Sequence, residues 1–311
     1  MAKRPLFTDN PASDVAYCNI RAAANEHTQS DRAECEALWE TYEGYADPEF
    51  LVEIRSGFDV RYWEMYLTTA LIDQGFDALC PKPGPDVGIE VDGRRLWFEA
   101  TSPSRGADGA PDQVPEMKAV RLGETPIVQD VPNEKMVLRY LNSISEKFDR
   151  QYAAWLKAGT VKPEDAFVIA INPRRLGHDF VDTSPPRILQ AAFAIGSPYI
   201  SIDRKTLKAV DKGFQFRDTI AKASKALVKT GVFHQEKYVG LSGLLCSRVD
   251  AANRPDRMGD DFQLVPNPQA SAPLPETFRL RGTYFRIEQV EDGYIATPEA
   301  SRPAGTAVGE S

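Results

Sequence analysis

The sequence lacks the features that mark membrane, secreted and disulfide-stabilised proteins. No apolar run approaches the roughly 20 residues that a membrane-spanning helix needs, and the opening residues MAKRPLFTDNPASD lack the apolar stretch of a secretory signal. The four cysteines lie far apart and form no C-x-x-C pair, which argues against a zinc knuckle or a disulfide framework. We therefore expect a soluble, cytoplasmic protein that does not bind membranes.

Histidine and nucleotide-binding motifs are also scarce. The three histidines, His27, His178 and His234, show no H-x-E or H-x-x-x-H spacing, so a zinc hydrolase site or a Ser/Cys-His arrangement has little support. No G-x-x-x-x-G-K-[ST] loop occurs, which argues against NTP hydrolysis. The net charge of −8 argues against a protein that coats nucleic acid, although a local basic patch would still permit a nuclease.

The chain does contain enough apolar material for a core, with 42% hydrophobic residues over 311 positions. Apolar spacing predicts helices within residues 14–44 and from about 58 to 74. Three short strands are expected next, at 76–80, 86–91 and 94–101, with an Asp92-Gly93 turn between the last two. These elements predict an α/β fold.

The second half of the chain is expected to add a crossover and less regular elements. A proline-rich loop at 102–132 precedes a long helix that Asn133 caps and Gly159 ends, and a buried strand follows at 166–172. A strand, helix, strand order favours parallel pairing. Further on, the patterns indicate helices at 188–196 and 216–231, strands at 197–203 and 237–250, and a hairpin and a disordered tail beyond 251.

Three acidic residues fall at definable places in this order. Glu64 lies on the helix that starts near 58, Asp86 heads one strand, and Glu99 lies near the end of the next. Because the two strands form a hairpin, Asp86 should lie opposite Glu99, a few ångströms away. Carboxylate oxygens at such a place suit Mg²⁺ or Mn²⁺.

The segment GPDVGIEVDGRRLWFEAT resembles the signature of the PD-(D/E)XK, or restriction-endonuclease-like, nucleases, with Pro85-Asp86 followed thirteen residues later by Glu99. The resemblance covers about residues 57 to 172. It implies an αβββαβ core with a mixed sheet flanked by helices. It also implies hydrolysis of phosphodiester bonds with Mg²⁺ (or Mn²⁺) as cofactor, held by Asp86 and Glu99 with Glu64 as a further ligand.

One position departs from the family pattern. The lysine expected two residues after the acidic residue is Thr101 here, and in some relatives this lysine has moved to the following helix. Lys147 is our candidate for the replacement, with Gln151 on the same helical face and Arg139 two turns earlier as supporting residues.

Each of these residues also has a structural interpretation. Asp86 can shape a turn after Gly-Pro, Glu64 can be a salt-bridged residue of its helix, and Lys147 and Gln151 can face solvent.

Two basic stretches, 172–177 and 201–217, can line a nucleic-acid path, with Tyr199, Phe214 and Phe216 available for stacking. An ordinary solvated surface explains these stretches equally well.

Taken together, the sequence predicts an N-terminal helical extension (1–56), a restriction-endonuclease-like core (57–250) and a C-terminal extension with a hairpin (251–311). The leading functional hypothesis is a metal-dependent endonuclease or exonuclease in DNA processing or defence, with DNA favoured over RNA as partner and a homodimer left open. The alternative, motivated by Thr101 and the acidic charge, is an inactive relative that acts as a binding or interaction module.

Overall fold

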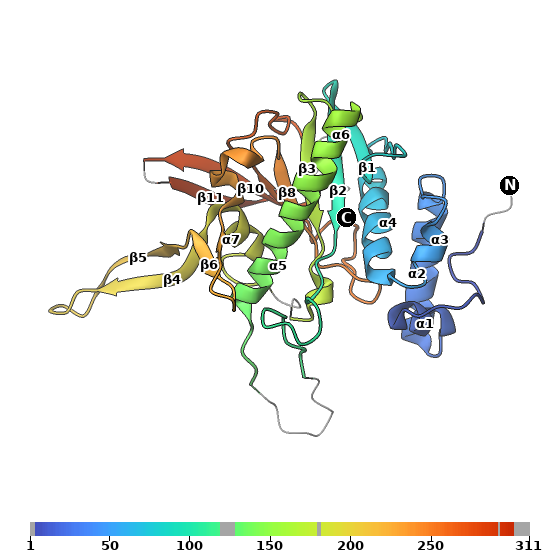
Figure 1. Cartoon of the computed structure of the whole chain (residues 1–311), viewed down its shortest axis with the longest axis horizontal. Helices are drawn as coiled ribbons and strands as arrows, with labels where there is room; N and C mark the ends of the chain where they lie inside the picture. Colours follow the sequence, from blue (N-terminus) through green and yellow to red (C-terminus); the bar gives the residue numbers. More distant parts are fainter. Residues whose placement is uncertain (1–3, 119–127, 179–181, 292, 302–311) are drawn as a thin grey trace, which may run out of the picture.

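The protein has a mixed α/β architecture built around a seven-stranded mixed sheet (Figure 1). The computed structural model describes residues 4–118, 128–178, 182–291 and 293–301. Two large clusters of buried apolar side chains lie on the two faces of the sheet. Within these ranges, no helix combines the length and apolar character needed to cross a membrane.

The sheet combines parallel and antiparallel pairs in the order β1-β2-β3-β8-β9-β10-β11. Three central strands, β2, β3 and β8, run parallel, and β1 pairs antiparallel with β2. The parallel pairing of β2 with β3 and the β1–β2 hairpin confirm the sequence prediction for both segments. The strands span Val87–Val91 (β1), Arg94–Thr101 (β2), Ala166–Ile171 (β3), Gly243–Cys246 (β8), Gln263–Pro266 (β9), Gly282–Val290 (β10) and Gly293–Ser301 (β11).

The N-terminal helices cover one face of the sheet and lie together in Figure 1. They are α1 (Val15–Ala22), α2 (Glu26–Tyr42), α3 (Phe50–Glu53) and α4 (Phe58–Asp73). The predicted helices within 14–44 and from 58 are therefore confirmed. In α4 the indole of Trp63 donates a hydrogen bond to the carbonyl of Ala170 in β3, 2.9 Å away, which fixes this helix against the centre of the sheet.

A second helical layer covers the other face. The long helix predicted from 133 to 159 forms as α5 (Asn133–Glu146), a π-helical segment η1 (Lys147–Tyr152) and α6 (Ala153–Ala158), followed by Gly159. After β3 come the short turns η2 (Arg174–Leu176), η3 (Val232–His234) and η4 (Glu236–Tyr238), and the helix α7 (Arg187–Phe193). π-helical segments are rare and frequently occur at functional sites.

The predicted capping role of Asn133 is wrong, because its amide is used between helices. Its side-chain oxygen accepts from Arg187 at 2.9 Å and its nitrogen donates to Gln190 at 2.8 Å. Pro132 takes the cap position instead. The bonds from α5 to α7 therefore hold the start of α5 in place.

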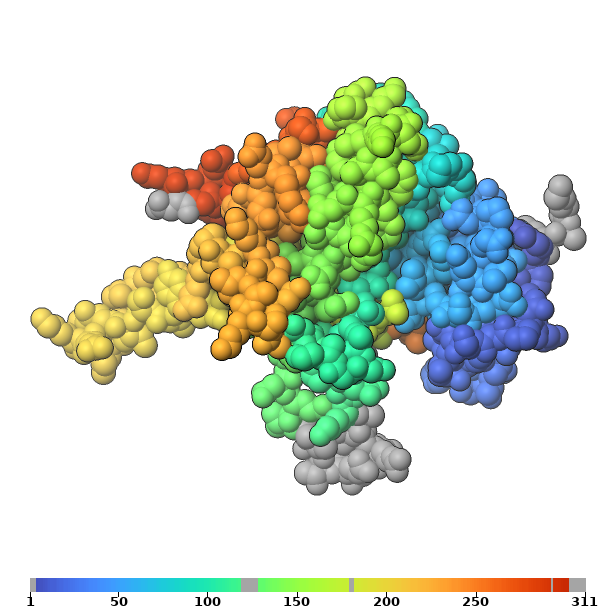
Figure 2. Space-filling model, viewed as in Figure 1, coloured from blue at the N-terminus to red at the C-terminus, as the bar shows by residue number. Residues whose placement is uncertain are grey.

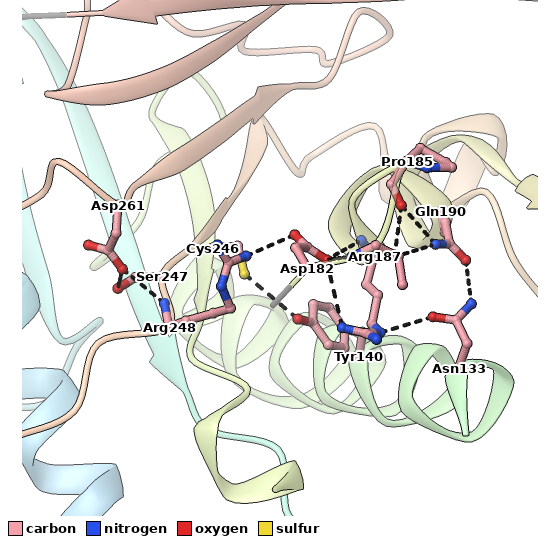
Figure 3. Close-up of polar contacts among 11 residues, drawn as sticks. Asn133, Tyr140, Asp182, Pro185, Arg187, Gln190, Cys246, Ser247, Arg248 and Asp261 are labelled. Carbon is pink, nitrogen blue, oxygen red and sulfur yellow. Dashed lines mark hydrogen bonds and ion pairs between the residues drawn. The ribbon is translucent and has the colours of Figure 1, made fainter. Parts of the chain in front are cut away.

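Figure 3 shows that these bonds belong to a larger polar network. Arg187 is buried and pairs with Asp182, which also accepts from Arg248 at 2.9 Å. The backbone of Arg248 in turn donates to Asp261. The network thus links α5 and α7 to the chain that follows β8.

Two other predicted elements differ in the structure. The strand expected at 76–80 is reduced to one bridge between Leu79 and Gly88, and the prolines that follow at 81, 83 and 85 have no N–H with which to continue the ladder. The helix expected at 216–231 is instead a small hairpin of β6 (Thr219–Ala221) and β7 (Leu227–Lys229). There the β-branched residues lie on the strands, and Lys225 has a positive φ that ends any helical run.

The remaining predictions are met in part. The strand within 197–203 forms as β4 (Ile195–Ile202), which pairs with β5 (Ala209–Phe216), and the 237–250 segment contributes only β8. The C-terminal hairpin forms as β10 and β11. The predicted disordered tail lies outside the described residues from 302 onward. The division at 56 and 250 stays a prediction; β9, β10 and β11 extend the central sheet.

Arg187→Met should lower the free energy of unfolding by about 3 kcal/mol, because it removes a buried guanidinium that binds both Asp182 and Asn133. Urea denaturation measures this. The matched control is Arg150→Met, which removes an exposed cation from the same helical layer and should change stability by less than about 0.5 kcal/mol. Equal effects of the two substitutions would contradict the role of the network.

Candidate active site

Asp86 and Glu99 meet at one end of the β1–β2 hairpin. The register pairs Val87 with Phe98, so Asp86, which directly precedes β1, lies opposite Glu99. The carboxylate of Asp86 accepts a hydrogen bond from the backbone N–H of Ala100 at 2.7 Å. The sequence prediction that these two residues face one another therefore agrees with the geometry.

Lys147 reaches this pair from the helical layer above the sheet. Its Nζ lies 2.6 Å from Oε1 of Glu99. The Glu99 side chain is only 3% exposed, and that of Lys147 is 22% exposed. Since Lys147 is the first residue of the π-helical segment η1, the irregular turn begins at the residue that contacts the acidic pair.

The electrostatics of the site are those of two carboxylates that share one cation. Burial raises the pKa of Asp86 well above its ordinary value, and the nearby charges of Glu99 and Glu64 add to this effect. Burial also raises the pKa of Glu99, although Lys147 opposes the shift. Burial alone would lower the pKa of Lys147, but attraction to Glu99 and Asp86 outweighs it and raises that pKa.

One oxygen in this site lacks a partner. Oε2 of Glu99 is buried and accepts no hydrogen bond from the described residues. A buried carboxylate oxygen without a partner is costly, and a cation beside it would offset both this cost and the repulsion between the two carboxylates.

Glu64 is engaged elsewhere. One of its oxygens accepts from the hydroxyl of Tyr42 at 2.6 Å, and the other pairs with Arg61. Burial and the neighbouring Glu64 raise the pKa of Tyr42, so the tyrosine stays a protonated donor. Glu64 is near enough to affect the pKa of Asp86, but the geometry gives no support to its predicted role as a direct metal ligand.

The two carboxylates of the site form a donor set that suits a divalent cation. Within the described ranges, no three His, Cys, Asp or Glu side chains gather in an arrangement that could hold a metal ion. Mg²⁺, however, usually keeps several waters and is held by one or two carboxylates together with substrate phosphates. Asp86 and Glu99, with the unpartnered oxygen of Glu99, fit that mode of binding.

The other predicted site residues, Thr101, Gln151 and Arg139, differ in burial and in their hydrogen bonds. Thr101 is buried at the end of β2, and its carbonyl accepts from the N–H of Asn172. The Gln151 side-chain oxygen is buried, with no partner among the described residues. Arg139 donates to the carbonyl of Ser104 at 2.6 Å, so it holds the loop after β2, and its predicted contact with the acidic pair is not formed.

The described contacts of the histidines do not include the acidic pair. His178 contacts the carbonyl of Pro115, His234 packs among aromatic rings, and His27 is exposed.

Sequence reasoning missed two residues of the site. Arg61 lies three positions before Glu64 on α4, a spacing that places the two side chains on one helical face, so this pair could have been found. Tyr42 lies on a different helix, and nothing in the sequence joins it to Glu64.

No family model matches the chain, and searches of the curated proteins and of the solved structures found no match either.

The raised pKa of Asp86 predicts how stability depends on pH. A carboxyl whose pKa rises on folding stabilises the protein only while it is protonated, and this contribution is lost as the pH rises through the folded-state value. Asp86→Asn keeps the acceptor for Ala100 and removes the charge. The variant should therefore resist urea better than the parent at pH 7, and the difference should shrink as the pH falls toward 4.

Glu90→Gln on β1 is the control for this comparison, because Glu90 is exposed. Its stability should follow that of the parent across the same pH range. A parent that is more stable than Asp86→Asn at pH 7 would contradict the account of the buried pair.

Proposed function

We propose that this protein is a metal-dependent phosphodiester hydrolase of the PD-(D/E)XK, restriction-endonuclease-like kind, which acts on nucleic acid and on DNA in preference to RNA. One observation carries the proposal. Lys147, on a helix remote in sequence, lies 2.6 Å from Glu99, so an ammonium group reaches the acidic pair although the signature position 101 is threonine.

The order of elements supports the proposed fold. Helix α4, the Leu79 bridge, β1, β2, the α5–α6 helix and β3 follow one another as helix, three extended segments, helix and strand. The first of the three extended segments contributes only a bridge, which makes it the weakest match to an αβββαβ core.

In the proposed site, Asp86 and Glu99 would hold Mg²⁺ or Mn²⁺. When bound, the cation stabilises negative charge on the phosphate and lowers the pKa of a bound water. The chain's own contribution is to hold two carboxylates in a buried place, where the charge of Glu99 also raises the pKa of Asp86.

Lys147 acts as a fixed donor. Because attraction to the carboxylates raises its pKa, it stays an ammonium at neutral pH, with three N–H donors and no lone pair. It can therefore donate to a phosphate oxygen or to the attacking water, but it cannot serve as the general base. Its partial exposure leaves room for that second contact.

Glu64 acts on the site through position and charge. Its bonds to Tyr42 and Arg61 hold a negative charge close enough to raise the pKa of Asp86. We infer that the charge of Glu64 makes cation binding at Asp86 and Glu99 more favourable, although Glu64 does not itself contact the cation.

Basic side chains beside the site could receive the substrate backbone. Arg139 and Arg175 both bind carbonyls of the loop that leaves β2, at Ser104 and Ser102. Arg175 is exposed. Phosphate contacts of this kind position a nucleic acid without reading its sequence.

The second candidate is a binding or interaction module without catalysis. The threonine at 101 and the net charge of −8 favour it. It predicts that nucleic acid or another partner binds equally well after Glu99 is changed.

Cleavage assays separate the two functions. Plasmid, single-stranded DNA and RNA are incubated with Mg²⁺ or Mn²⁺ and with the parent, Asp86→Asn, Glu99→Gln or the exposed control Glu90→Gln. Each of the two site substitutions should lower the cleavage rate at least about 100-fold, the scale of losing one electrostatic stabiliser. The control should retain the parent rate.

Undiminished cleavage by Asp86→Asn would contradict the assignment of this site. If the parent cleaved none of the three substrates with either cation, the binding module would become the better account.

A further inference from the structure

Residues 195–230, which we call the basic segment, carry a charge opposite to that of the whole chain. They contain eight Lys and Arg against three Asp, a net charge of +5, whereas the chain has a net charge of −8. The other residues are therefore together more acidic than the whole. The eight cations are Arg204, Lys205, Lys208, Lys212, Arg217, Lys222, Lys225 and Lys229.

Most cations of the basic segment have no carboxylate partner. In the described part of the chain, Arg217 is the one member of the group that forms an ion pair, with Glu134 at 2.9 Å. Lys208, Lys212 and Lys225 are exposed. Exposed cations that are not neutralised by neighbouring carboxylates attract anionic ligands.

Strands β4 and β5 form a two-stranded arm, residues 195–216, that projects from the body of the protein (Figures 1 and 2). The arm lies outside the seven-stranded sheet. Residues two apart on a strand point to the same side, so Lys212, Phe214 and Phe216 of β5 share one face. Phe214 is 46% exposed and Phe216 is 72% exposed. This face of the arm therefore presents a cation and two aromatic rings in a row.

The two phenylalanines also line a groove at the base of the arm. The groove has a volume of about 700 Å³, and Phe193 of α7 and Tyr294 of β11 contribute to its wall. The ring of His234 lies 6.1 Å from that of Phe216 and 5.5 Å from that of Tyr294. Among the described residues, no Asp, Glu, Lys or Arg lines the groove. Uncharged aromatic walls of this kind suit a flat ring, and the volume is in the usual range for small-ligand pockets.

The basic segment contacts the loop that leaves the candidate active site. The side chain of Asp112, in the loop after β2, accepts a hydrogen bond from the backbone N–H of Ala223 at 2.7 Å. Ala223 lies in the turn between β6 and β7, together with Lys222 and Lys225. Strand β2 ends two residues after Glu99 and leads directly into this loop. One loop thus joins the acidic pair to the lysines of the turn.

We propose that the arm and the groove at its base bind a single-stranded segment of nucleic acid. The cations of the arm contact phosphates, and an unpaired base stacks in the groove on Phe214 and Phe216. Two residues along a strand span about 7 Å, so a phosphate on Lys212 leaves its base within reach of Phe214. Every base has a face that can stack, so we expect little dependence on sequence.

The chemistry of the two surfaces selects this ligand. In a duplex the bases are paired and stacked on one another, so only an unpaired base can enter the groove. An apolar peptide would fill the groove but leave the cations of the arm without a partner. A single strand offers phosphates to the cations and base rings to the aromatic wall.

Fluorescence anisotropy without metal ions tests the proposal separately from cleavage. The probes are labelled single-stranded DNA and RNA of about 20 nucleotides, which exceeds one such site, and a blunt DNA duplex of equal length. The parent should bind single-stranded DNA at least about tenfold more tightly than the duplex. Equal affinities for the two would overturn the proposal, as would a parent that binds neither single-stranded probe.

The groove is tested by Phe214→Ala combined with Phe216→Ala. Because stacking is lost, single-stranded DNA should bind at least about tenfold more weakly, while duplex binding stays as in the parent. Both side chains are exposed, so the melting profile should not change.

Tyr199→Ala is the matched control for the groove. Tyr199 is the third aromatic residue that the sequence offers for stacking, but it pairs with Gly213 and so lies on the opposite face of the arm. This variant should keep the parent affinity. An equal loss in Tyr199→Ala and in the double variant would overturn the assignment of the groove.

The phosphate contacts are tested by Lys208→Gln combined with Lys212→Gln. Each phosphate contact contributes roughly 0.7 to the slope of log affinity against log salt for a single strand, so the slope should fall by about 1.4. The control is Lys157→Gln combined with Lys162→Gln, which removes two exposed cations outside the basic segment and should leave the slope unchanged. An unchanged slope in the first variant would contradict the role of the arm.

This inference rests on the proposed function for its substrate, but the two can fail separately. A parent that binds single-stranded DNA through the groove and cleaves no nucleic acid would support the inference and contradict the hydrolase. A parent that cleaves nucleic acid, with unchanged binding in the Phe214→Ala, Phe216→Ala variant, would support the hydrolase and overturn the inference.

Discussion

The contact between Lys147 and Glu99 joins the helical layer to the sheet at a place where charge would otherwise be buried without compensation. Two carboxylates, Asp86 and Glu99, are held in a site that raises the pKa of both. A single ammonium, held 2.6 Å away, cannot neutralise two charges. With both carboxyls ionised, the site carries a negative charge that this ammonium does not balance, and a proton or a divalent cation can offset it.

The position of Lys147 depends on contacts far from the site. Asn133, at the start of α5, is bound by Arg187 and Gln190 of α7. At the other end, the regular helix gives way to a π-helical segment at Lys147 itself. The start of the helix is thus fixed by part-buried polar bonds to α7, and the irregular turn sets the direction in which the lysine leaves it.

Sequence reasoning located the acidic pair because that part of the problem is local. The Asp92-Gly93 turn fixes the hairpin register, and the register fixes which residues lie opposite one another. Lys147 was a candidate only because the family resemblance allows the lysine to move to the following helix. Its contact with Glu99 depends on how α5 packs, which periodicity does not reveal.

The sequence predictions that were wrong also failed because long-range packing is not visible in local patterns. The 216–231 segment has a helical composition, yet its buried Ile220 and its turn at Lys225 place it in a hairpin. Arg139 was expected near the acidic pair, but its guanidinium donates to the carbonyl of Ser104 instead. Tyr42 was not considered at all, because its bond to Glu64 joins two separate helices. Long-range packing decides each of these cases.

The central claim is that Lys147 supplies the cation that the signature places at position 101, and the most direct test moves the lysine from 147 to 101. Nuclease activity is measured for the parent, for Lys147→Met, and for Lys147→Met combined with Thr101→Lys, which places the cation at the signature position. The account predicts at least about a 100-fold loss in the single variant and a recovery of at least tenfold in the combined variant. Equal cleavage by the parent and by Lys147→Met would contradict it.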